Sequence, residues 1–520
     1  MKRIIAFLLC LVLTASLLGC GKEQEYVPTG GALIIDGETV PPTEADDDSA
    51  NQRLELAYYP ADSLNPYKAS NYANRVLFSL LYQGLFAVDR SYQPVPMLCK
   101  SYTMTEDMRT YTFYLEEATF SDGVKLTVED VYASLETAMK SQVYGGRFTH
   151  VAAMNITESG ALSFRLDTAM ENFPILLDVP VVKAADVSAE RPIGTGPYYY
   201  ENAANGLRLR KRGDWWCTSD LLVTANVIPL QEVTSVLTQR DAFEFSNVGV
   251  ACADPCSDAY VDYRCDYELW EVDNGTMLYL GCNMQSKVFG KEKIRAALTY
   301  AIDRETIANT YYRGFGQAAT LAASPSSPYY NKQLADRYAY NLEKFSQVIS
   351  DEYMLGATVR FVVNKEDSLR VRVAREIAQT LRDCGLVVEL VELSTRGYME
   401  TLNYNMFDLY LGQTRLSPNM DLTPFFRYYG KLQYGGMPDN NIYALCLQAL
   451  ANSGNYYNML ETVADDGRLC PILFHSYSVH ATRGLLTGLN PARDNIFSYS
   501  IGKTIADVYR ELSEETDQTS

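Results

Sequence analysis

The stretch ATVRFVVNKEDSLRVRVAREIAQTLRDCGLVVELVEL, at residues 357–393, is the most informative part of the chain for the fold class. We predict a strand over residues 357–363 and a second strand over residues 386–393. Residues 368–384 between them form a predicted helix, which Gly385 ends. A strand, a helix and a strand in this order form a βαβ unit, in which the strands are parallel and helices cover the sheet. The sequence therefore predicts an α/β protein.

Two more segments indicate the same mixture of strands and helices. Residues 111–115 alternate as a strand does, and Thr127 with Asp130 forms a capping box that opens a helix reaching about Lys140. In the segment Lys291–Tyr311 the apolar residues recur at helical spacing, which predicts one continuous helix.

The N-terminus has the pattern of a secretory signal. The cations of Met1-Lys2-Arg3 precede an apolar run over residues 4–13, and small residues then lead into a cysteine, in Leu17-Leu18-Gly19-Cys20. A cysteine at the cleavage point is typical of a lipoprotein signal. We therefore expect residues 1–19 to be removed and Cys20 to be lipidated, which anchors the protein in the membrane. An ordinary signal peptide and a single transmembrane helix are the alternatives, and the apolar run is short for a span.

Residues 20–52 form a predicted flexible, acidic tether behind the lipidated cysteine. They are rich in Gly, Pro and acidic residues and lack hydrophobic periodicity. The folded region is expected to begin near Arg53, where RLELAYY gives the first alternating strand. Residues 511–520 are predicted to be a disordered tail.

Length and charge limit the possible functions. About 500 residues stay after removal of the signal, too many for one hydrophobic core, so two or three domains are expected. The formal net charge of −19 argues against nucleic acid and anionic membrane surfaces as partners. Tyrosine is frequent, at 39 residues, and suits an adaptable recognition surface, although most of these rings can equally be ordinary core or surface residues.

The cysteines and histidines indicate neither a metal site nor catalysis. Of 11 cysteines, Cys10 and Cys20 belong to the signal and the lipid site, so an odd number is left and a monomer has at least one free thiol. Cys252 and Cys256 are spaced for a local disulfide. His475 and His480 differ from the i,i+4 spacing of a helical metal site. We predict no catalytic residues, no metal site and no cofactor, although paired carboxylates come together only in the fold.

Several short phrases follow one another in a fixed order along the chain. They are Leu64-Asn65-Pro66, Phe120-Ser121-Asp122-Gly123, Leu126-Thr127-Val128-Glu129-Asp130-Val131, Ile193-Gly194-Thr195-Gly196-Pro197-Tyr198 and Ile294-Arg295-Ala296-Ala297-Leu298-Thr299-Tyr300-Ala301-Ile302-Asp303-Arg304. Singly, each has a structural explanation as a turn, a helix cap or an amphipathic helix. Together, from about Leu54 to Ser500, they resemble the family-five extracellular solute-binding proteins, which are the dipeptide-, oligopeptide- and nickel-binding components of ABC importers.

This resemblance implies a two-lobed, periplasmic-binding-protein-like (Venus flytrap) α/β fold with an extra N-terminal subdomain. Lobe I would comprise residues 53–245, completed by about residues 475–510, and lobe II would comprise residues 246–474. The implied protein is a lipid-anchored monomer on the outer face of the cytoplasmic membrane, extracellular or periplasmic. It would capture a small-molecule ligand, a peptide or peptide-like solute, by lobe closure. Its partners would be an ABC permease and the ATPase of that permease.

The resemblance also indicates a ligand-binding segment. Peptide binders of the family carry a Gly-Trp-x-x-Asp run, which supplies an aromatic wall and a carboxylate for the peptide α-amine. The matching run here is Gly412-Gln413-Thr414-Arg415-Leu416, in which Gln413 replaces tryptophan and Leu416 replaces the carboxylate. The charge-assisted partner of a buried ammonium is therefore missing. Arg415 either pairs with an anionic group or points to solvent, and Asp421 is a candidate substitute for the missing carboxylate.

Two alternatives stay open. The ligand could be nickel, a metallophore or another non-peptide solute, since a chelated metal needs only one protein residue. A surface lipoprotein that senses its ligand without transport would have the same sequence features.

Overall fold

The structure is a computed structural model that describes residues 34–35, 38–39, 54–217, 219 and 221–511. It comprises two compact units, residues 1–47 and residues 48–520. In the first unit, β1 (Ile34–Ile35) pairs with β2 (Glu38–Thr39) in an antiparallel ladder. The second unit contains all the other elements. The predicted signal, Cys20 and most of the predicted tether and tail lie outside the described residues.

One sheet of 11 strands organises the second unit. In spatial order its strands are β10 (Tyr198–Ala203), β11 (Gly206–Lys211), β12 (Val227–Glu232), β3 (Leu56–Tyr58), β13 (Val250–Ala253), β19 (Leu469–Ala481), β14 (Glu268–Cys282), β18 (Leu409–Arg415), β16 (Thr358–Asn364) and β17 (Val387–Leu393), and β15 (Gly316–Ala318) pairs with β19. We call the part built on β10, β11, β12, β3 and β13 the first lobe. The part built on β18, β16 and β17 is the second lobe.

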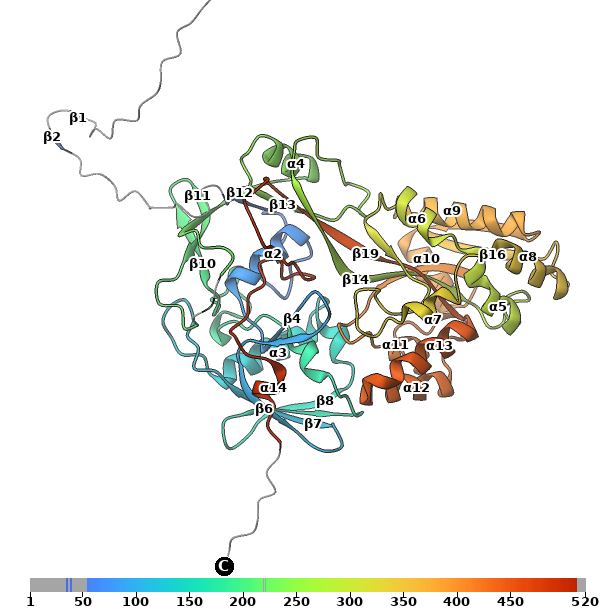
Figure 1. Cartoon of the computed structure of the whole chain (residues 1–520), viewed down its shortest axis with the longest axis horizontal. Coiled ribbons are helices and arrows are strands. Elements are labelled where there is room, and N and C mark those ends of the chain that lie inside the picture. Colours follow the sequence, from blue (N-terminus) through green and yellow to red (C-terminus); the bar gives the residue numbers. More distant parts are fainter. Residues whose placement is uncertain (1–33, 36–37, 40–53, 218, 220, 512–520) are drawn as a thin grey trace, which may run out of the picture. The chain divides into compact units, whose positions relative to one another are not determined.

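The long strands β14 and β19 belong to both lobes, as Figure 1 shows. Residues 268–273 of β14 pair with the C-terminal half of β19 beside β13, whereas residues 276–282 pair with β18. The register shifts between Asp273 and Met277, and Gly275 has a φ of 74° at this irregularity. Since glycine adopts a positive φ at little cost, it permits the irregularity where the strand passes between the lobes.

The predicted βαβ unit is confirmed in the second lobe. Strands β16 and β17 are parallel neighbours, and α9 (Ser368–Asp383) connects them. Asp367 caps this helix by accepting a hydrogen bond from the Arg370 amide (2.9 Å). Gly385, at a φ of 92°, follows the helix and turns the chain into β17.

The prediction of one continuous helix over Lys291–Tyr311 is wrong. The structure has α5 (Glu292–Leu298), a 3₁₀ turn (Thr299–Ala301) and α6 (Arg304–Thr310). The chain is extended at Ile302, and the Asp303 carboxylate accepts a hydrogen bond from the Thr306 amide (3.0 Å), which caps α6. The break turns Arg304 inward, where its guanidinium donates to the carbonyl oxygens of Thr299, Ile302, Ala319 and Pro471. Local capping chemistry thus outweighs the apolar periodicity.

A separate antiparallel sheet forms a subdomain that shares its hydrophobic core with the first lobe. Its strands are, in spatial order, β6 (Cys99–Met104), β7 (Thr110–Leu115), β9 (Leu162–Leu166) and β8 (Val151–Ile156). The predicted strand at residues 111–115 is thereby confirmed. The predicted capping box is also confirmed, because the Thr127 amide donates to the Asp130 carboxylate (3.0 Å) at the start of α3 (Val128–Lys140). Near the C-terminus, the amide of Arg510 donates to the Tyr102 carbonyl on β6 (2.8 Å).

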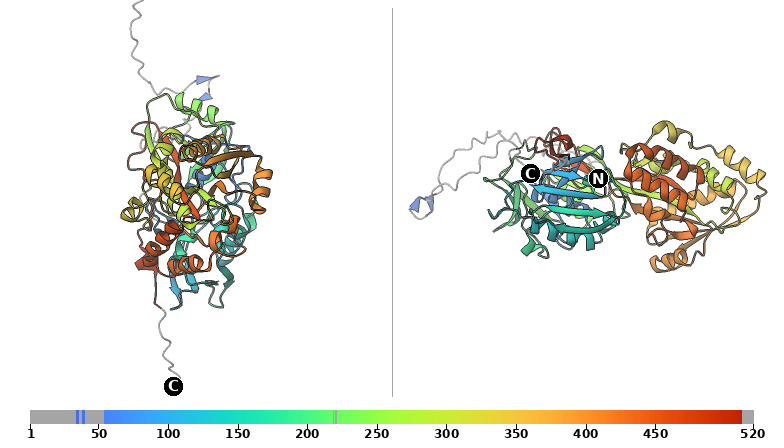
Figure 2. Two further views of the ribbon diagram at one scale, coloured as in Figure 1. Left: turned by 90° about the vertical axis from the view of Figure 1, so that its right-hand side faces the viewer. Right: turned by 90° about the horizontal axis from the view of Figure 1, so that it is seen from below.

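The other elements are mainly helices that cover the two lobes. They are α2 (Tyr72–Leu81), β4 (Phe86–Val88), β5 (Pro94–Pro96), α4 (Val236–Glu244), α7 (Lys332–Asp336), α8 (Leu342–Asp351), α10 (Thr395–Asn403), α11 (Thr423–Phe426), α12 (Asn440–Ala451), α13 (Tyr456–Asp466) and α14 (Ile505–Val508). Figure 2 shows helices around the strands of the second lobe, which is coloured from yellow to orange.

Cys252 and Cys256, whose spacing would allow a local disulfide, are not joined in the structure. Every cysteine among the described residues is a free thiol. Cys252 lies on β13 in the core of the first lobe, whereas the thiol of Cys256 donates to the Phe315 carbonyl and packs in the core of the second lobe.

The predicted lobe boundary at residues 245 and 246 stays a prediction. Strand β13, which follows it, pairs with β3 of the first lobe.

Candidate functional site

A cavity of about 670 Å³ has walls from both lobes and the subdomain. The first lobe contributes residues 69–75 at the start of α2, and the subdomain contributes residues 142–149 after α3. The second lobe contributes residues 414–417 at the end of β18 and residues 421–432 around α11. This volume is within the range of roughly 300–1,000 Å³ that small-molecule sites occupy.

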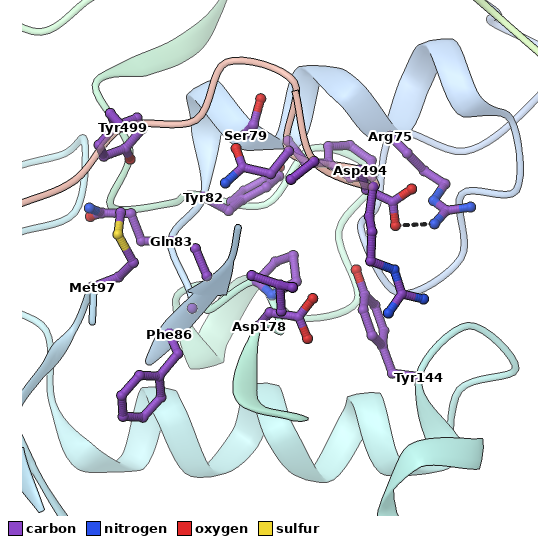
Figure 3. Close-up of a pocket in the computed structure, with 18 residues that line it drawn as sticks. Arg75, Ser79, Tyr82, Gln83, Phe86, Met97, Tyr144, Asp178, Asp494 and Tyr499 are labelled. Atoms are coloured by element: carbon purple, nitrogen blue, oxygen red, sulfur yellow. Dashed lines mark hydrogen bonds and ion pairs between the residues drawn. The ribbon is translucent and has the colours of Figure 1, made fainter. Parts of the chain in front are cut away.

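A smaller pocket of about 90 Å³ lies beneath α2 and adjoins the large cavity. The two share Arg75, Tyr144 and Arg493 in their walls. Figure 3 shows this pocket, with Asp178 and Tyr144 on the same side of the space as the linked pair of Arg75 and Asp494. The small pocket therefore extends the cavity into the first lobe.

The Asp494 carboxylate is the centre of a cluster of arginines. It accepts hydrogen bonds from Arg75 on α2 and from Arg415 at the end of β18. Burial raises the pKa of this carboxyl, but the charges of Arg415, Arg75 and Arg493 lower it more, so that the pKa lies well below its usual range. Asp494 is therefore ionised and links residues of both lobes.

The structure places four of the predicted ligand-binding residues at the cavity and two elsewhere. Thr414, Arg415, Leu416 and Asp421 line it. Gly412 and Gln413 lie further back along β18 and are absent from its wall. Gly412 is in contact with the ring of Tyr279, since a Cβ at this position would lie 2.5 Å from the Tyr279 Cζ.

Arg415 is held by the protein itself instead of pointing freely to solvent. Its Nε donates to the Asn274 carbonyl (2.8 Å), and its Nη2 donates to the Asp494 carboxylate (3.0 Å). The side chain is 24% exposed and forms part of the cavity wall. In the structure the anion that pairs with Arg415 belongs to the chain, and a contact of Arg415 with an anionic group of a ligand stays a prediction.

Asp421 already has partners within the protein. It accepts hydrogen bonds from the amide (2.8 Å) and hydroxyl (2.9 Å) of Thr423, and its Oδ2 lies 3.5 Å from the Nε2 of His150. The other imidazole nitrogen of His150 lies 2.8 Å from the Asp167 carboxylate. Asp421 can therefore serve a ligand ammonium only by sharing its charge with His150.

Several residues of the site were not predicted from the sequence. They are Arg75, Tyr144, Arg147, Arg493 and Asp494. All lie outside the Gly412–Leu416 segment that the resemblance indicates, and the sequence contains no motif around them. The adjacent charged pair Arg493-Asp494, in a segment of turns near the C-terminus, is the one local signal that could have drawn attention.

The described residues contain no group of three His, Cys, Asp or Glu side chains placed to hold a metal ion. His475 and His480 both lie on β19 and are buried. Burial lowers the pKa of His475 to about 3 and that of His480 to about 4, so both imidazoles are neutral near pH 7. None of the described helices combines the length and the apolar character needed to span a bilayer.

Residues 93–436 match the family described as bacterial extracellular solute-binding proteins, family 5 Middle. The protein therefore belongs to this family, and the resemblance noted in the sequence is confirmed. The glutathione-binding protein GsiB of Salmonella typhi is 25% identical over 283 residues, which is 51% of this chain and 55% of that protein. The chain thus matches about half the length of this curated relative.

Solved structures support the predicted two-lobed fold. A putative peptide-binding protein AppA from Clostridium difficile superimposes with a TM-score of 0.69 at 15% identity, over 86% of this chain and 98% of that chain. NikZ from Campylobacter jejuni, solved in complex with Ni(L-His), superimposes with a TM-score of 0.60 at 16% identity, over 88% of this chain and 98% of that chain. The α/β fold of two-lobed periplasmic binding proteins is therefore confirmed.

Proposed function

We propose that this protein is the lipid-anchored, substrate-binding component of an ABC importer, and that it captures peptides or peptide-like solutes outside the membrane. The cavity of about 670 Å³ between the lobes is the observation that carries the proposal, because its walls come from both lobes of a solute-binding fold. Closure of the lobes on a solute buries that solute, and the closed form then docks on a permease.

The choice of a peptide-like solute is supported by the cavity and by the relatives. The cavity wall contains the aromatic residues Tyr144, Phe425 and Tyr428 together with polar and cationic residues. GsiB is named for glutathione binding and AppA for putative peptide binding, and we extend these substrate classes to this chain. Selectivity would come from burial and hydrogen bonding without catalysis.

Uptake measurements test this proposal. Cells lacking the gene are given an isotope-labelled peptide digest, and import is compared with that of the parent strain and of a complemented strain. We expect loss of uptake for a subset of labelled peptides and its recovery on complementation. Unchanged uptake of every peptide would contradict a peptide importer. If loss of nickel uptake is seen instead, the solute is a metal chelate.

A further inference from the structure

We propose that Arg493 is the centre of a subsite that binds an oxyanion group, a carboxylate or a phosphate, of the solute. The protein would thus take an anionic solute. This inference rests on the proposed function, since it names the substrate class of the same cavity.

The charge of the cavity wall is opposite to that of the whole chain. The sequence has a formal net charge of −19. Yet six cationic side chains line the large cavity and its extension, namely Arg75, Arg147, Arg415, Arg427, Lys431 and Arg493. The carboxylates in the same walls are Asp178, Asp421 and Asp494. An acidic protein that concentrates cations in its solute cavity attracts and stabilises an anion there.

Arg427 is half-buried and Lys431 is exposed, and hydrogen bonds show which of the other four cations is left for a ligand. Arg75 and Arg415 share Asp494, and Arg147 pairs with Asp178. Arg493 donates one long bond from Nη2 to the Leu416 carbonyl (3.4 Å), and its Nη1 has no partner in the structure. Arg493 as a whole is only 5% exposed. A buried guanidinium without a carboxylate is unfavourable, whereas an oxyanion can accept two parallel hydrogen bonds from it.

The surroundings hold the Arg493 side chain in a defined place. Its guanidinium carbon lies 5.6 Å from the centre of the Tyr92 ring, a favourable cation–π arrangement. A Cβ on Gly275 would come within 3.0 Å of Nη2, so glycine at this position leaves room for the guanidinium. Arg493 itself has a φ of 45°, a backbone conformation that is uncommon outside glycine. The chain thus adopts an unfavourable conformation that places this cation in the cavity wall.

The charges of Asp178 and Asp494 act on Arg493 from nearby, but among the described residues no carboxylate forms a hydrogen bond or an ion pair with its guanidinium. The charge of Asp494 is shared between Arg75 and Arg415, and one of its oxygens, Oδ1, has no hydrogen-bond partner. Asp273, which interacts with Tyr92, accepts hydrogen bonds from the Ser324 hydroxyl and the Gly275 amide. Burial lowers the pKa of Arg493, and the charge of Arg415 lowers it further, which an incoming oxyanion would reverse.

Binding of simple anions to the full chain in mild detergent provides the test. The probes are glutarate, inorganic phosphate and the neutral glutaramide, each at constant ionic strength, and the readout is the melting temperature. We expect glutarate, phosphate or both to stabilise the wild-type protein and glutaramide not to do so. Stabilisation by glutarate alone would identify a carboxylate, and stabilisation by phosphate alone would identify a phosphate. No response to either anion, or an equal response to glutaramide, would overturn the proposal.

Two substitutions locate the subsite. Arg493→Gln should weaken the binding of the effective anion by about thirtyfold or more, and Arg493→Lys should retain part of it. Arg396→Gln, on the exposed face of α10, is the control and should behave as wild type. Undiminished anion binding by Arg493→Gln would overturn the assignment. Since both Arg493 variants are melted without anion first, a folding defect is seen separately.

The result also separates this inference from the proposed function. Suppose that anion binding depends on Arg493 but that deletion of the gene leaves all uptake unchanged. This result would support the subsite and contradict the importer. If the solute is neutral, is imported and binds to Arg493→Gln as tightly as to wild type, the importer is supported and the anion subsite is contradicted.

Discussion

Arg415, at the end of β18 in the second lobe, donates a hydrogen bond to the carboxylate of Asp494 (3.0 Å), which lies in the C-terminal segment packed on the first lobe. Arg75 of α2 donates to the same carboxylate oxygen. One acidic side chain therefore joins the two lobes beside the cavity between them. The contact also explains why an arginine occupies position 415.

Asp494→Asn should strongly destabilise the protein. The substitution leaves Arg75, Arg415 and Arg493 together without their central negative charge, and breaking a buried ion pair costs about 3–5 kcal/mol. Denaturant unfolding at neutral pH measures the change in the free energy of unfolding. Asp266→Asn is the matched control, because its partner Arg483 lies at the surface and little change is expected. Equal stability of the two variants would contradict the role given to Asp494.

Gly275→Ala should disturb both stability and solute binding. A residue with a side chain is strained at a φ of 74°, by about 1–2 kcal/mol, and the added Cβ would also displace the Arg493 guanidinium. Gly123→Ala is a matched control, since Gly123 has a φ of 81° but open space around it. Both variants should lose stability, and only Gly275→Ala should lose affinity for anions. Equal anion affinity in the two variants would separate Gly275 from the subsite.

His150 should make the protein more stable at acidic than at alkaline pH. Burial lowers the pKa of His150, but hydrogen bonds and charges of Asp421 and Asp167 outweigh burial and raise it above 6.5. The folded-state pKa is thus higher than the unfolded one. The stabilisation is fully present below pH 6.5 and is lost as the pH rises through the folded-state value.

The measurement is the free energy of unfolding of wild type and His150→Gln from about pH 5 to about pH 9. We expect the variant to lose about 1 kcal/mol at the acidic end and less at the alkaline end. For His480→Asn, the stability difference from wild type should change with pH in the opposite direction. Burial depresses the pKa of His480 to about 4, so the stabilisation by this neutral imidazole is lost as the pH falls below 6.5. A constant difference between wild type and His150→Gln at all pH values would refute the titration of His150.

The thiols should be reduced and differ in reactivity. Cys217 and Cys265 are partly exposed, whereas the other seven described cysteines are buried. Iodoacetamide under native conditions should therefore modify Cys217 and Cys265 first, as peptide mass spectrometry would show. A reducing agent should leave the melting temperature unchanged. Rapid labelling of Cys252 or Cys256, or a disulfide between them, would contradict the structure.

Cys20→Ala should release the protein from the membrane. The lipid anchor proposed for this residue supplies the attachment, since two acyl chains are needed for stable anchoring. Cell fractionation followed by immunoblotting gives the distribution of the protein. Cys10→Ala, inside the apolar run, is the control and should stay membrane-bound. Membrane association that survives Cys20→Ala would exclude lipidation as the anchor.

The fold was predictable where local patterns agree with tertiary structure. The βαβ unit at residues 357–393 and the capping box at Thr127 combine periodicity with clear start and stop signals, and both are confirmed. The single helix predicted over residues 291–311 failed because Asp303 caps a new helix and Arg304 is needed inside the protein. Periodicity does not reveal such a buried set of carbonyl acceptors.

The site was predictable only in part, because its charges come from distant segments. The Gly412–Leu416 run led to Arg415, which does line the cavity. Its partner Asp494 is 79 residues away in sequence, and Arg75 is 419 residues away from Asp494. Such clusters form only when the sheet brings the lobes together, so no spacing in the sequence predicts them. The same holds for Cys252 and Cys256, which are near in sequence but pack in different cores.

Native mass spectrometry of the full chain, purified in mild detergent without refolding, shows whether the protein carries an anionic, peptide-like solute. We expect a bound solute that is released on mild activation, has the mass of a peptide or peptide-like molecule and carries an anionic group. Arg493→Gln purified in parallel should carry much less of it. A protein that is consistently free of solute, and that no member of a peptide library stabilises, would contradict the capture of peptides or peptide-like solutes.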